Sequence, residues 1–320
     1  MWEYLITRPL GFIINFIYGF VQNYGWSIIL FTVIVKMILL QLNIRSQKAM
    51  KNQQKIQPYL AELQKKYAND KEKLQTEMMK LYRENNVSMT GGCLPLLIQF
   101  PILIGFYQVI RRPITYLAGV TDWKLPEVVD KVTTLKETVM AQFPNLVGNL
   151  GNFSVEDFEK NGQIELASWA SKVNGTEDAW AINFDFFGLD LADVPSKAIN
   201  ALNSLLNGQA VEWGVLLLLS IPVLAVFTSW LSMKITQMQQ NKGQENAATS
   251  ANDMSKSMNL MMPLMTGFFT FTLPSGMGVY WIVSNIAQIV QQVILNHIFD
   301  NKEDEIDVKL PEKNRKKRKK

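Results

Sequence analysis

One lysine stands inside an apolar run. Residues 32–42 have the sequence TVIVKMILLQL, with Lys36 near the middle. A lysine at the centre of a membrane helix costs about 2.5–3.5 kcal/mol on insertion scales, which the flanking aliphatic residues can offset. No Asp or Glu occurs between Glu3 and Glu62, so this run offers the ammonium no carboxylate. Lys36 is therefore predicted to face water and neutral polar groups.

Amide and hydroxyl side chains in the other apolar runs could supply those groups. On the last run, four polar or amphipathic residues follow a 4, 3, 4 spacing and share one helical face. The predicted groove-lining set is Lys36, Thr32, Gln99, Thr266, Trp281, Asn285, Gln288 and Gln292. Such a set predicts a wet, net-positive recess that opens to the cytoplasm and attracts acidic or polar segments. An alternative is that the amides only hold helices together.

Other kinds of chemistry have little support in the sequence. The single histidine, His297, lies at the end of the last apolar run, and no metal-ligand cluster or glycine-rich phosphate loop occurs. We therefore expect no enzyme, no cofactor and no metal. The competing function is a transporter or channel for a small anion that uses Lys36 as its site. Internal repeats, which are common in transporters, are not visible.

The elements that would position these residues are membrane helices. The chain is 48% hydrophobic, and five apolar runs approach the roughly 20 residues needed to cross a bilayer. The sequence predicts an all-α polytopic membrane protein with five spans, an N-terminal interfacial helix and a cytoplasmic αα-hairpin. The predicted segments are 1–25 (interfacial helix), 26–44 (first span), 45–90 (hairpin), 93–112 (second span), 113–211 (long extracytoplasmic loop), 212–233 (third span), 234–256 (cytoplasmic linker), 257–273 (fourth span), 276–297 (fifth span) and 298–320 (basic cytoplasmic tail).

Charge predicts the orientation of these spans. Residues 45–90 carry ten Lys/Arg and five Asp/Glu, whereas 113–211 carry six Lys and thirteen Asp/Glu. The positive-inside rule places the basic segment and the tail in the cytoplasm and the acidic loop outside. The N-terminus then lies outside, with 1–25 on the outer leaflet. A sixth span in that segment is the alternative and would reverse the N-terminus.

Residues 46–88 are polar but periodic. Ile56, Leu60, Leu63 and Tyr67 repeat at 4, 3, 4 spacing, and Asp70 is a candidate N-cap after a turn. We expect a short hairpin whose first helix opens at Pro58. The predicted client or partner contacts are Tyr59, Leu63, Tyr67, Met78 and Met79. A solvated helical linker is the alternative.

The chain ends in an almost purely basic segment. Its predicted contacts with ribosomal RNA or anionic lipid are Arg315, Lys316, Lys317, Arg318, Lys319 and Lys320. Both partners would be bound through charge, independently of sequence. A merely solvated tail is the alternative.

Several motifs carry a resemblance to a known family. Residues 91–101 have the sequence GGCLPLLIQFP, which closely resembles the GGC-PLLIQ-P signature of the YidC family of membrane protein insertases. PSG at 274–276 and YWIVSN at 280–285 are similar to the family's last helical pair, and Lys36 occupies the position of its groove-lining cation. The likeness covers about 26–117 and 184–299.

The resemblance implies a function. Family members have a five-helix core with a hydrophilic groove that takes up the polar segment of a nascent membrane protein and releases its hydrophobic segment into the bilayer. The partners implied are nascent membrane proteins, the Sec translocon, ribosomes and membrane lipids, in a bacterial cell membrane. This chain departs from the family in having Lys36 instead of arginine, and in its long loop at 113–211. The short N-terminus resembles the form found in bacteria with a single membrane.

Overall fold

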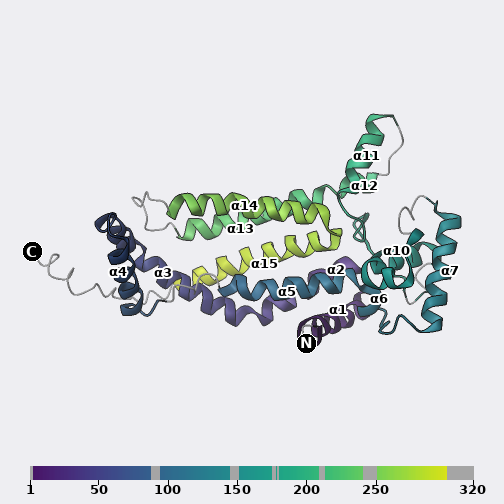
Figure 1. The fold of residues 1–320 in the computed structure, drawn as a ribbon, viewed down its shortest axis with the longest axis horizontal. Helices are drawn as coiled ribbons and strands as arrows, with labels where there is room; N and C mark the ends of the chain where they lie inside the picture. The colour runs from purple at the N-terminus through teal and green to yellow at the C-terminus, as the bar shows by residue number, and fades with distance from the viewer. Residues whose placement is uncertain are drawn as a thin grey trace, which may run out of the picture. The chain divides into compact units, whose positions relative to one another are not determined.

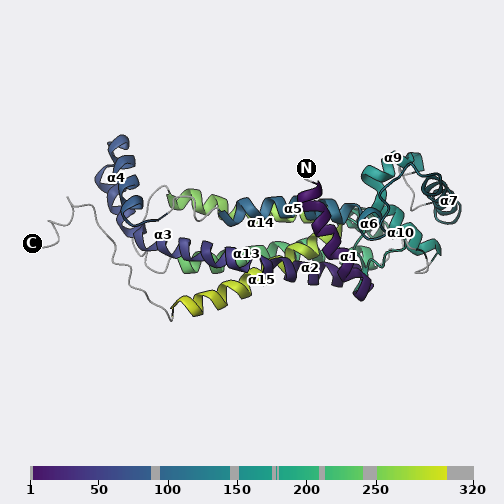
Figure 2. The same ribbon diagram turned by 90° about the horizontal axis from the view of Figure 1, so that it is seen from below.

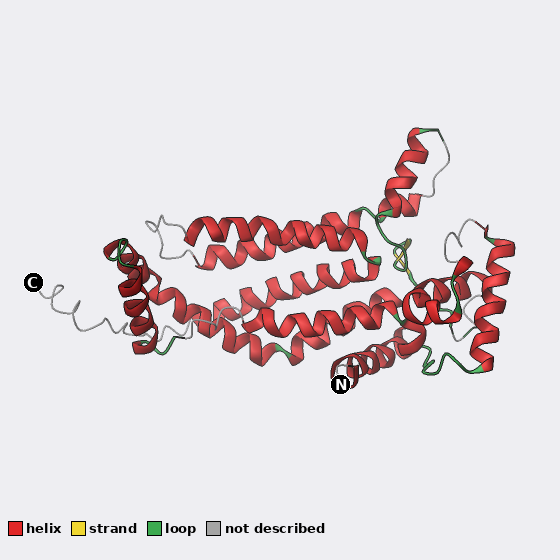
Figure 3. Cartoon of the chain, viewed as in Figure 1, coloured by secondary structure: helices red, strands yellow, loops and turns green. Residues whose placement is uncertain are grey.

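The computed structural model of the chain describes residues 3–87, 94–144, 151–174, 178, 180–208, 213–240 and 251–300. Figure 3 shows that the described parts are almost entirely helical. The elements in chain order are η1 (Glu3–Thr7), α1 (Arg8–Val21), α2 (Tyr24–Ile38), α3 (Leu40–Lys66), α4 (Lys71–Glu84), α5 (Leu94–Arg111), α6 (Pro113–Tyr116), α7 (Pro126–Gln142), α9 (Val155–Asp157), η3 (Phe158–Gly162), α10 (Gln163–Asn174), β1 (Asp185–Phe186), β2 (Leu189–Asp190), α11 (Lys197–Leu206), α12 (Trp213–Leu217), α13 (Ser220–Gln240), α14 (Ala251–Thr272) and α15 (Ser275–Asp300) (Figure 1).

The chain forms two compact units. The loop unit comprises Met1–Val35, Phe100–Ser229 and Pro263–Ser284. The hairpin unit comprises Lys36–Gln99, Trp230–Met262 and Asn285–Lys320. Long helices contribute to both, so each unit is described by itself.

Apolar helices long enough to cross a membrane are present. Among the described residues, three helical stretches qualify by length and composition: Glu3–Val21, Trp213–Met238 and Ser275–Ile298. The pair α2 and α3, interrupted at Leu39, adds a fourth if it is counted as one broken span. The protein is therefore nearly all-α with three to four candidate spans, and the number five stays a prediction.

Aromatic stacking organises the loop unit. Phe106 of α5 is fully buried and lies between two rings from other helices. Its ring centroid is 4.4 Å from that of Phe31 on α2, with the planes nearly parallel, and 4.7 Å from that of Tyr280 on α15. Stacked aromatic pairs contribute about 0.5–1.5 kcal/mol beyond their buried area. This cluster holds α2, α5 and α15 together.

The N-terminal helix α1 packs on the loop unit through small and aliphatic residues. Gly11, Ile14 and Ile17 form its buried face, and Gly11 lies directly against the ring of Tyr116. The helix stops at Gln22, which adopts a left-handed conformation (φ 52°), and α2 begins two residues later. Figure 2 shows α1 running crosswise to α2.

The helices α3 and α4 form a hairpin with its own core. Ile56, Leu60 and Leu63 of α3 pack with Leu81 and Tyr82 of α4. The Asp70 carboxylate accepts a hydrogen bond from the Lys73 amide and caps α4, as the spacing predicts.

The predicted start of this hairpin at Pro58 is wrong. The first helix begins at Leu40 and continues through Pro58 to Lys66. A proline inside a helix removes one backbone hydrogen bond. Here the helix runs on because three buried residues around Pro58 anchor both sides to α4.

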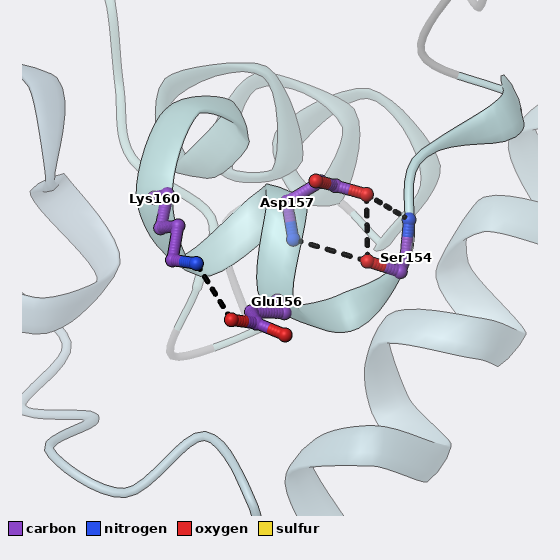
Figure 4. Close-up of polar contacts among 4 residues, drawn as sticks. All are labelled: Ser154, Glu156, Asp157 and Lys160. Atoms are coloured by element: carbon purple, nitrogen blue, oxygen red, sulfur yellow. Dashed lines mark hydrogen bonds and ion pairs between the residues drawn. The ribbon is translucent and has the colours of Figure 1, made fainter.

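The long loop 113–211 is folded in its described parts. The Trp, Phe and Val content of this loop predicts short helices at 127–142 and 165–173, and α7 and α10 lie at those positions. Between them, α9 begins with a capping box in which Ser154 and Asp157 exchange hydrogen bonds, followed by an ion pair between Lys160 and Glu156 at 2.6 Å (Figure 4). Polar caps of this kind satisfy the free amides at a helix start.

A short antiparallel hairpin joins this loop to the spans. Strands β1 and β2 pair Asp185 with Asp190 and Phe186 with Leu189. Both turn residues have positive φ angles, 54° at Phe187 and 77° at Gly188, which suit a two-residue hairpin turn.

Main-chain hydrogen bonds fasten both sides of that hairpin, and we call residues 182–193 the clamp segment. The Tyr24 amide donates to the Asn183 carbonyl at 2.9 Å, at the start of α2. The Gly276 amide donates to the Leu191 carbonyl at 3.1 Å, at the start of α15. The clamp segment therefore ties the ends of two helices together.

Two predicted boundaries differ from the structure. Helices α13 and α14 extend to Gln240 and from Ala251, which shortens the linker predicted at 234–256. Polar Gln, Asn and Ser residues do not by themselves end a helix, so composition alone placed the end of α13 too early and the start of α14 too late.

Candidate functional site

Lys36 lies in the last turn of α2, at the edge of the hairpin unit. Its side chain is half-buried. Among the described residues, no carboxylate forms an ion pair with it, in agreement with the absence of acids from the neighbouring sequence. A partly buried ammonium without an anion depends on polar neighbours or water for its solvation.

Polar side chains of the hairpin unit connect α15 to two other helices. The Asn43 side-chain amide of α3 donates to Gln291 at 3.3 Å, and the Thr236 hydroxyl of α13 donates to Gln292 at 3.1 Å. Gln292 is only 5% exposed. For Gln292, the contact matches the alternative that amides hold helices together.

Several amide atoms in this unit have no hydrogen-bond partner in the part of the chain that the structure describes. Gln47 Oε1 on α3, and Gln291 Nε2 and Asn296 Nδ2 on α15, are buried without a hydrogen bond to any described residue. Each such atom costs about 1–3 kcal/mol if it stays unsatisfied. Their concentration on two helices gives the hairpin unit a polar interior.

The other predicted groove residues are divided between the two units. In the hairpin unit, Gln99 and Asn285 are half-buried, and Gln288 is exposed. The loop unit holds the remaining three, Thr32, Thr266 and Trp281. Five of the eight predicted groove residues, including Lys36 and Gln292, therefore belong to the hairpin unit, and three belong to the loop unit.

The three residues of the loop unit have local roles. The Thr32 hydroxyl is fully buried and donates to the Ile28 carbonyl at 2.7 Å, within its own helix. The Thr266 carbonyl accepts from the Thr270 hydroxyl at 2.8 Å. The Trp281 ring stacks on Phe269, with centroids 6.3 Å apart.

Sequence reasoning missed Asn43, Thr236 and Gln291. Asn43 lies seven residues after Lys36, a spacing that could have identified it as a groove residue. It falls at the end of the predicted first span, which changes to the hairpin at residue 45. Gln291 is next to the predicted Gln292, on a neighbouring part of the α15 surface. Pairings such as Asn43 with Gln291 are far apart in sequence and are not predictable from spacing alone.

The predicted partner contacts on the hairpin have unequal exposure. Leu63 is 4% exposed and belongs to the hairpin core, so its side chain offers no surface to a partner. Tyr59, Tyr67 and Met78 pack partly against that core, and Met79 is 58% exposed. The periodicity that singled out Leu63 is that of the core face itself.

A cavity of about 340 Å³ lies in the loop unit, away from the predicted groove residues. Its lining is polar, but the charged groups are engaged locally. Lys172 Nζ lies 3.5 Å from Asp190 Oδ2, and Asp185 accepts from the Gly188 amide. Asp193 accepts from Lys197 at 2.6 Å. This cavity is stabilised by its own hydrogen bonds and holds none of the predicted site residues.

Some predictions fall outside the described residues. These are the basic tail contacts from Arg315 to Lys320 and the first part of the signature, residues 91–93. Within the described ranges, no group of three His, Cys, Asp or Glu side chains converges in a way that could hold a metal ion.

The fold and these side chains define a helical membrane protein in which one unit combines amides with a cation that is unpaired among the described residues. The model of the family described as "60Kd inner membrane protein" matches residues 16–303. The chain belongs to this family, in agreement with the resemblance at 91–101 and 274–285.

Curated relatives match most of the chain. A membrane protein insertase YidC of Caldanaerobacter subterraneus subsp. tengcongensis is 30% identical over 289 residues, which cover 90% of this chain and 93% of the relative. The membrane protein insertase YidC 2 of Listeria innocua is 27% identical, with 95% and 75% covered. The membrane protein insertase YidC of Nitratidesulfovibrio vulgaris is 27% identical over 91% of this chain but only 38% of the relative.

Proposed function

We propose that this protein is a membrane protein insertase and chaperone. Family membership over residues 16–303 supports the proposal, as do the three relatives named membrane protein insertases. In this proposal, polar segments of nascent membrane proteins enter a positively charged hydrophilic groove, and their hydrophobic segments pass into the bilayer.

The observation that carries the groove proposal is that Lys36 and several buried amide atoms without a partner among the described residues belong to the same compact unit. Within the described part of the chain, Lys36 has no ion pair, and buried amide atoms of Gln47, Gln291 and Asn296 have no hydrogen-bond partner. In a dry interior, all of these groups would stay without hydrogen bonds, which would destabilise the fold. A hydrated groove would satisfy them and leave the ammonium free to attract an acidic segment of a client.

The energetics of such a cycle need no covalent step. A client segment of about 20 apolar residues gains roughly 6–12 kcal/mol on entering the bilayer, at about 0.3–0.6 kcal/mol per residue. A groove that shelters the polar flank lowers the barrier to this transfer without changing its net free energy. Nucleotide hydrolysis is unnecessary because the client's own partitioning drives the reaction.

The proposal includes the partners that the family resemblance implies and the orientation predicted from charge. The hairpin segment (45–90) and the tail would lie in the cytoplasm, where the ribosome and the Sec translocon deliver clients. The basic residues Arg315–Lys320 would bind ribosomal RNA or anionic lipid.

We also propose that α1 lies on the outer leaflet instead of spanning it. The supporting contacts join it to the loop segment: Gly11 lies against Tyr116, and the Tyr18 hydroxyl accepts from the Asn183 amide at 3.0 Å. Its opposite face exposes Phe12, Phe16 and Phe20, as expected for a helix embedded sideways in lipid.

Site-specific crosslinking to stalled nascent membrane proteins tests the insertase proposal. Photoreactive residues at Gln99 and Gln288 should crosslink to the client, whereas one at the exposed Val223 of α13 should react mainly with lipid. If these two positions never contact a client while Lys36→Ala abolishes a solute flux in proteoliposomes, the protein is a transporter and the insertase proposal is wrong.

A further inference from the structure

We propose that α11 is a second interfacial helix, whose apolar face is embedded in the lipid leaflet beside the α14–α15 turn. This inference is independent of the insertase proposal, because it requires only that the neighbouring helices span a membrane. The occupant of the apolar face is the acyl-chain region of the bilayer.

Residues of α11 are segregated by polarity around the helix. Apolar side chains occupy one continuous arc, at Ala198, Ile199, Ala201, Leu202, Leu205 and Leu206. Lys197, Asn200, Asn203 and Ser204 occupy the other arc. The helix contains no acidic residue, so no carboxylate opposes contact with lipid headgroups.

Most of the apolar arc is not covered by protein. Ile199, Leu202, Leu205 and Leu206 are all exposed, and Leu206 reaches 77%. Ala198 is the buried residue of the helix. Four large aliphatic side chains exposed on one face of a ten-residue helix are costly in water, because apolar surface favours removal from water.

The start of α11 is fixed at the end of two long apolar helices. The Ser196 amide donates to the Phe271 carbonyl of α14 at 3.0 Å. The Ser275 hydroxyl, at the start of α15, donates to the Asp193 carbonyl at 2.6 Å. Since α15 is a candidate span, the turn between α14 and α15 lies at a membrane surface, and α11 begins at that level.

The region beyond α11 is fixed at a similar level. Helix α11 contacts α12, where the candidate span Trp213–Met238 begins. Trp213 is 72% exposed, and tryptophan is enriched at the membrane–water interface. Figure 1 shows α11 extending crosswise to α14. A helix that begins beside one span end, contacts the start of another span and lies across α14 follows the plane of the interface.

Lipid is the favoured occupant because the apolar arc adjoins an existing lipid-facing surface. The exposed Leu217 and Val223 continue from Trp213 along the same candidate span. The alternative occupant is a second copy of the chain, and the experiment below distinguishes it from lipid.

Spin-label accessibility in liposomes tests the placement. In a Cys93→Ser background, single cysteines replace Leu202 and Leu206 on the apolar arc, and Asn200 and Asn203 on the polar arc as matched controls. We expect labels on the apolar arc to collide mainly with oxygen, and labels on the polar arc mainly with a water-soluble nickel chelate. Equal access of the nickel chelate to all four positions would overturn the inference. Tenfold dilution of the protein with lipid should leave the pattern unchanged, and its loss would assign the face to a second copy.

A measurement on the unmodified protein keeps the test valid if a cysteine variant does not fold. A phosphatidylcholine with a diazirine on its acyl chain is photolysed with the reconstituted protein, and the labelled peptides are identified by mass spectrometry. Labels within 197–206 are expected at a yield within about threefold of those around Val223. Labelling around Val223 with none in 197–206 would show that α11 is outside the acyl-chain region.

Discussion

At the scale of single residues, the charge of Lys36 should set client preference. Replacing it by Glu reverses the charge, so acidic leader segments would be repelled instead of attracted. We expect Lys36→Glu to slow insertion of clients with acidic leaders at least tenfold and of clients with neutral leaders much less, measured by protease protection in proteoliposomes. Lys36→Arg keeps the charge and serves as the control. Equal loss across all clients would indicate damage to the fold instead.

A second residue-scale prediction concerns Glu165 of α10. Burial raises the pKa of its carboxyl above the usual value, and Oε2 has no hydrogen-bond partner among the described residues. A raised folded-state pKa means that the protonated form stabilises the fold below the unfolded pKa, and that this stability is lost as pH rises through the folded pKa. Glu165→Gln, which is neutral at every pH, should therefore raise the melting temperature near pH 8 and change it little near pH 4.

Thermal unfolding in nanodiscs at the two pH values measures this difference. Glu156→Gln provides the control, because Glu156 is exposed and paired with Lys160. A stabilisation of Glu165→Gln that is the same at both pH values would argue against ionisation as its cause.

At the scale of elements, α1 depends on a close approach at Gly11. A Cβ at this position would overlap the Tyr116 ring, whereas one at Gly19 would meet nothing within 4 Å. We expect Gly11→Ala to destabilise the packing of α1 by about 1–3 kcal/mol, and Gly19→Ala to be neutral or slightly stabilising. Hydrogen exchange of residues 3–21 measures the effect. Combining Gly11→Ala with Tyr116→Ala should restore the packing, and a failure to do so would place the clash elsewhere.

The α3–α4 hairpin offers a similar matched pair. Leu81 is fully buried in its core, and Met79 on the same helix is exposed. Leu81→Ala should cost about 2–5 kcal/mol of local stability, and Met79→Ala close to none. Faster hydrogen exchange of 56–66 and 71–84 in the full-length protein is the expected result for Leu81→Ala alone. Equal exchange in both variants would mean that the two helices do not depend on a shared core.

Spacing and composition predicted the helices better than their ends. Leu74, Met78 and Leu81 follow a 4, 3 spacing that predicts α4, and the Trp, Phe and Val content of the long loop placed α7 and α10 within two residues of their observed bounds. The start of α3 was missed because Pro58 is a usual first-turn residue, while tertiary packing kept the helix continuous there. Composition could not have decided between these two outcomes.

At the scale of the whole molecule, the predicted groove stays a prediction, and its internal contacts could not be predicted from the sequence. The lack of acids around Lys36 follows directly from the residues. The contacts of Asn43 with Gln291 and of Thr236 with Gln292 link segments 248 and 56 residues apart, and only a folded chain reveals them. The same limit applies to Leu63, which periodicity marks without saying whether a partner or the core covers it.

The concentration of charge in the tail gives a prediction for the molecule as a whole. Replacing the six basic residues of Arg315–Lys320 by Gln should weaken cosedimentation with ribosomes, most strongly at low salt. The log–log salt slope should become shallower by about 0.7–0.9 for each phosphate that the tail no longer neutralises. Pure anionic vesicles, tested in parallel, separate lipid from RNA as the partner. Unchanged binding to both would mean that the tail is only solvated.

The clamp segment of residues 182–193 joins helices through main-chain atoms, notably at Asn183 and Leu191. Every amino acid has a backbone carbonyl, and every one except proline has a backbone N–H. Substitution of the exposed residues that lie between Asn183 and Leu191 should therefore be tolerated. A change of length should not be tolerated, since one added residue would move the Leu191 carbonyl away from the Gly276 amide. In related chains, the exposed positions of this stretch are therefore expected to vary in composition while its residue count stays constant.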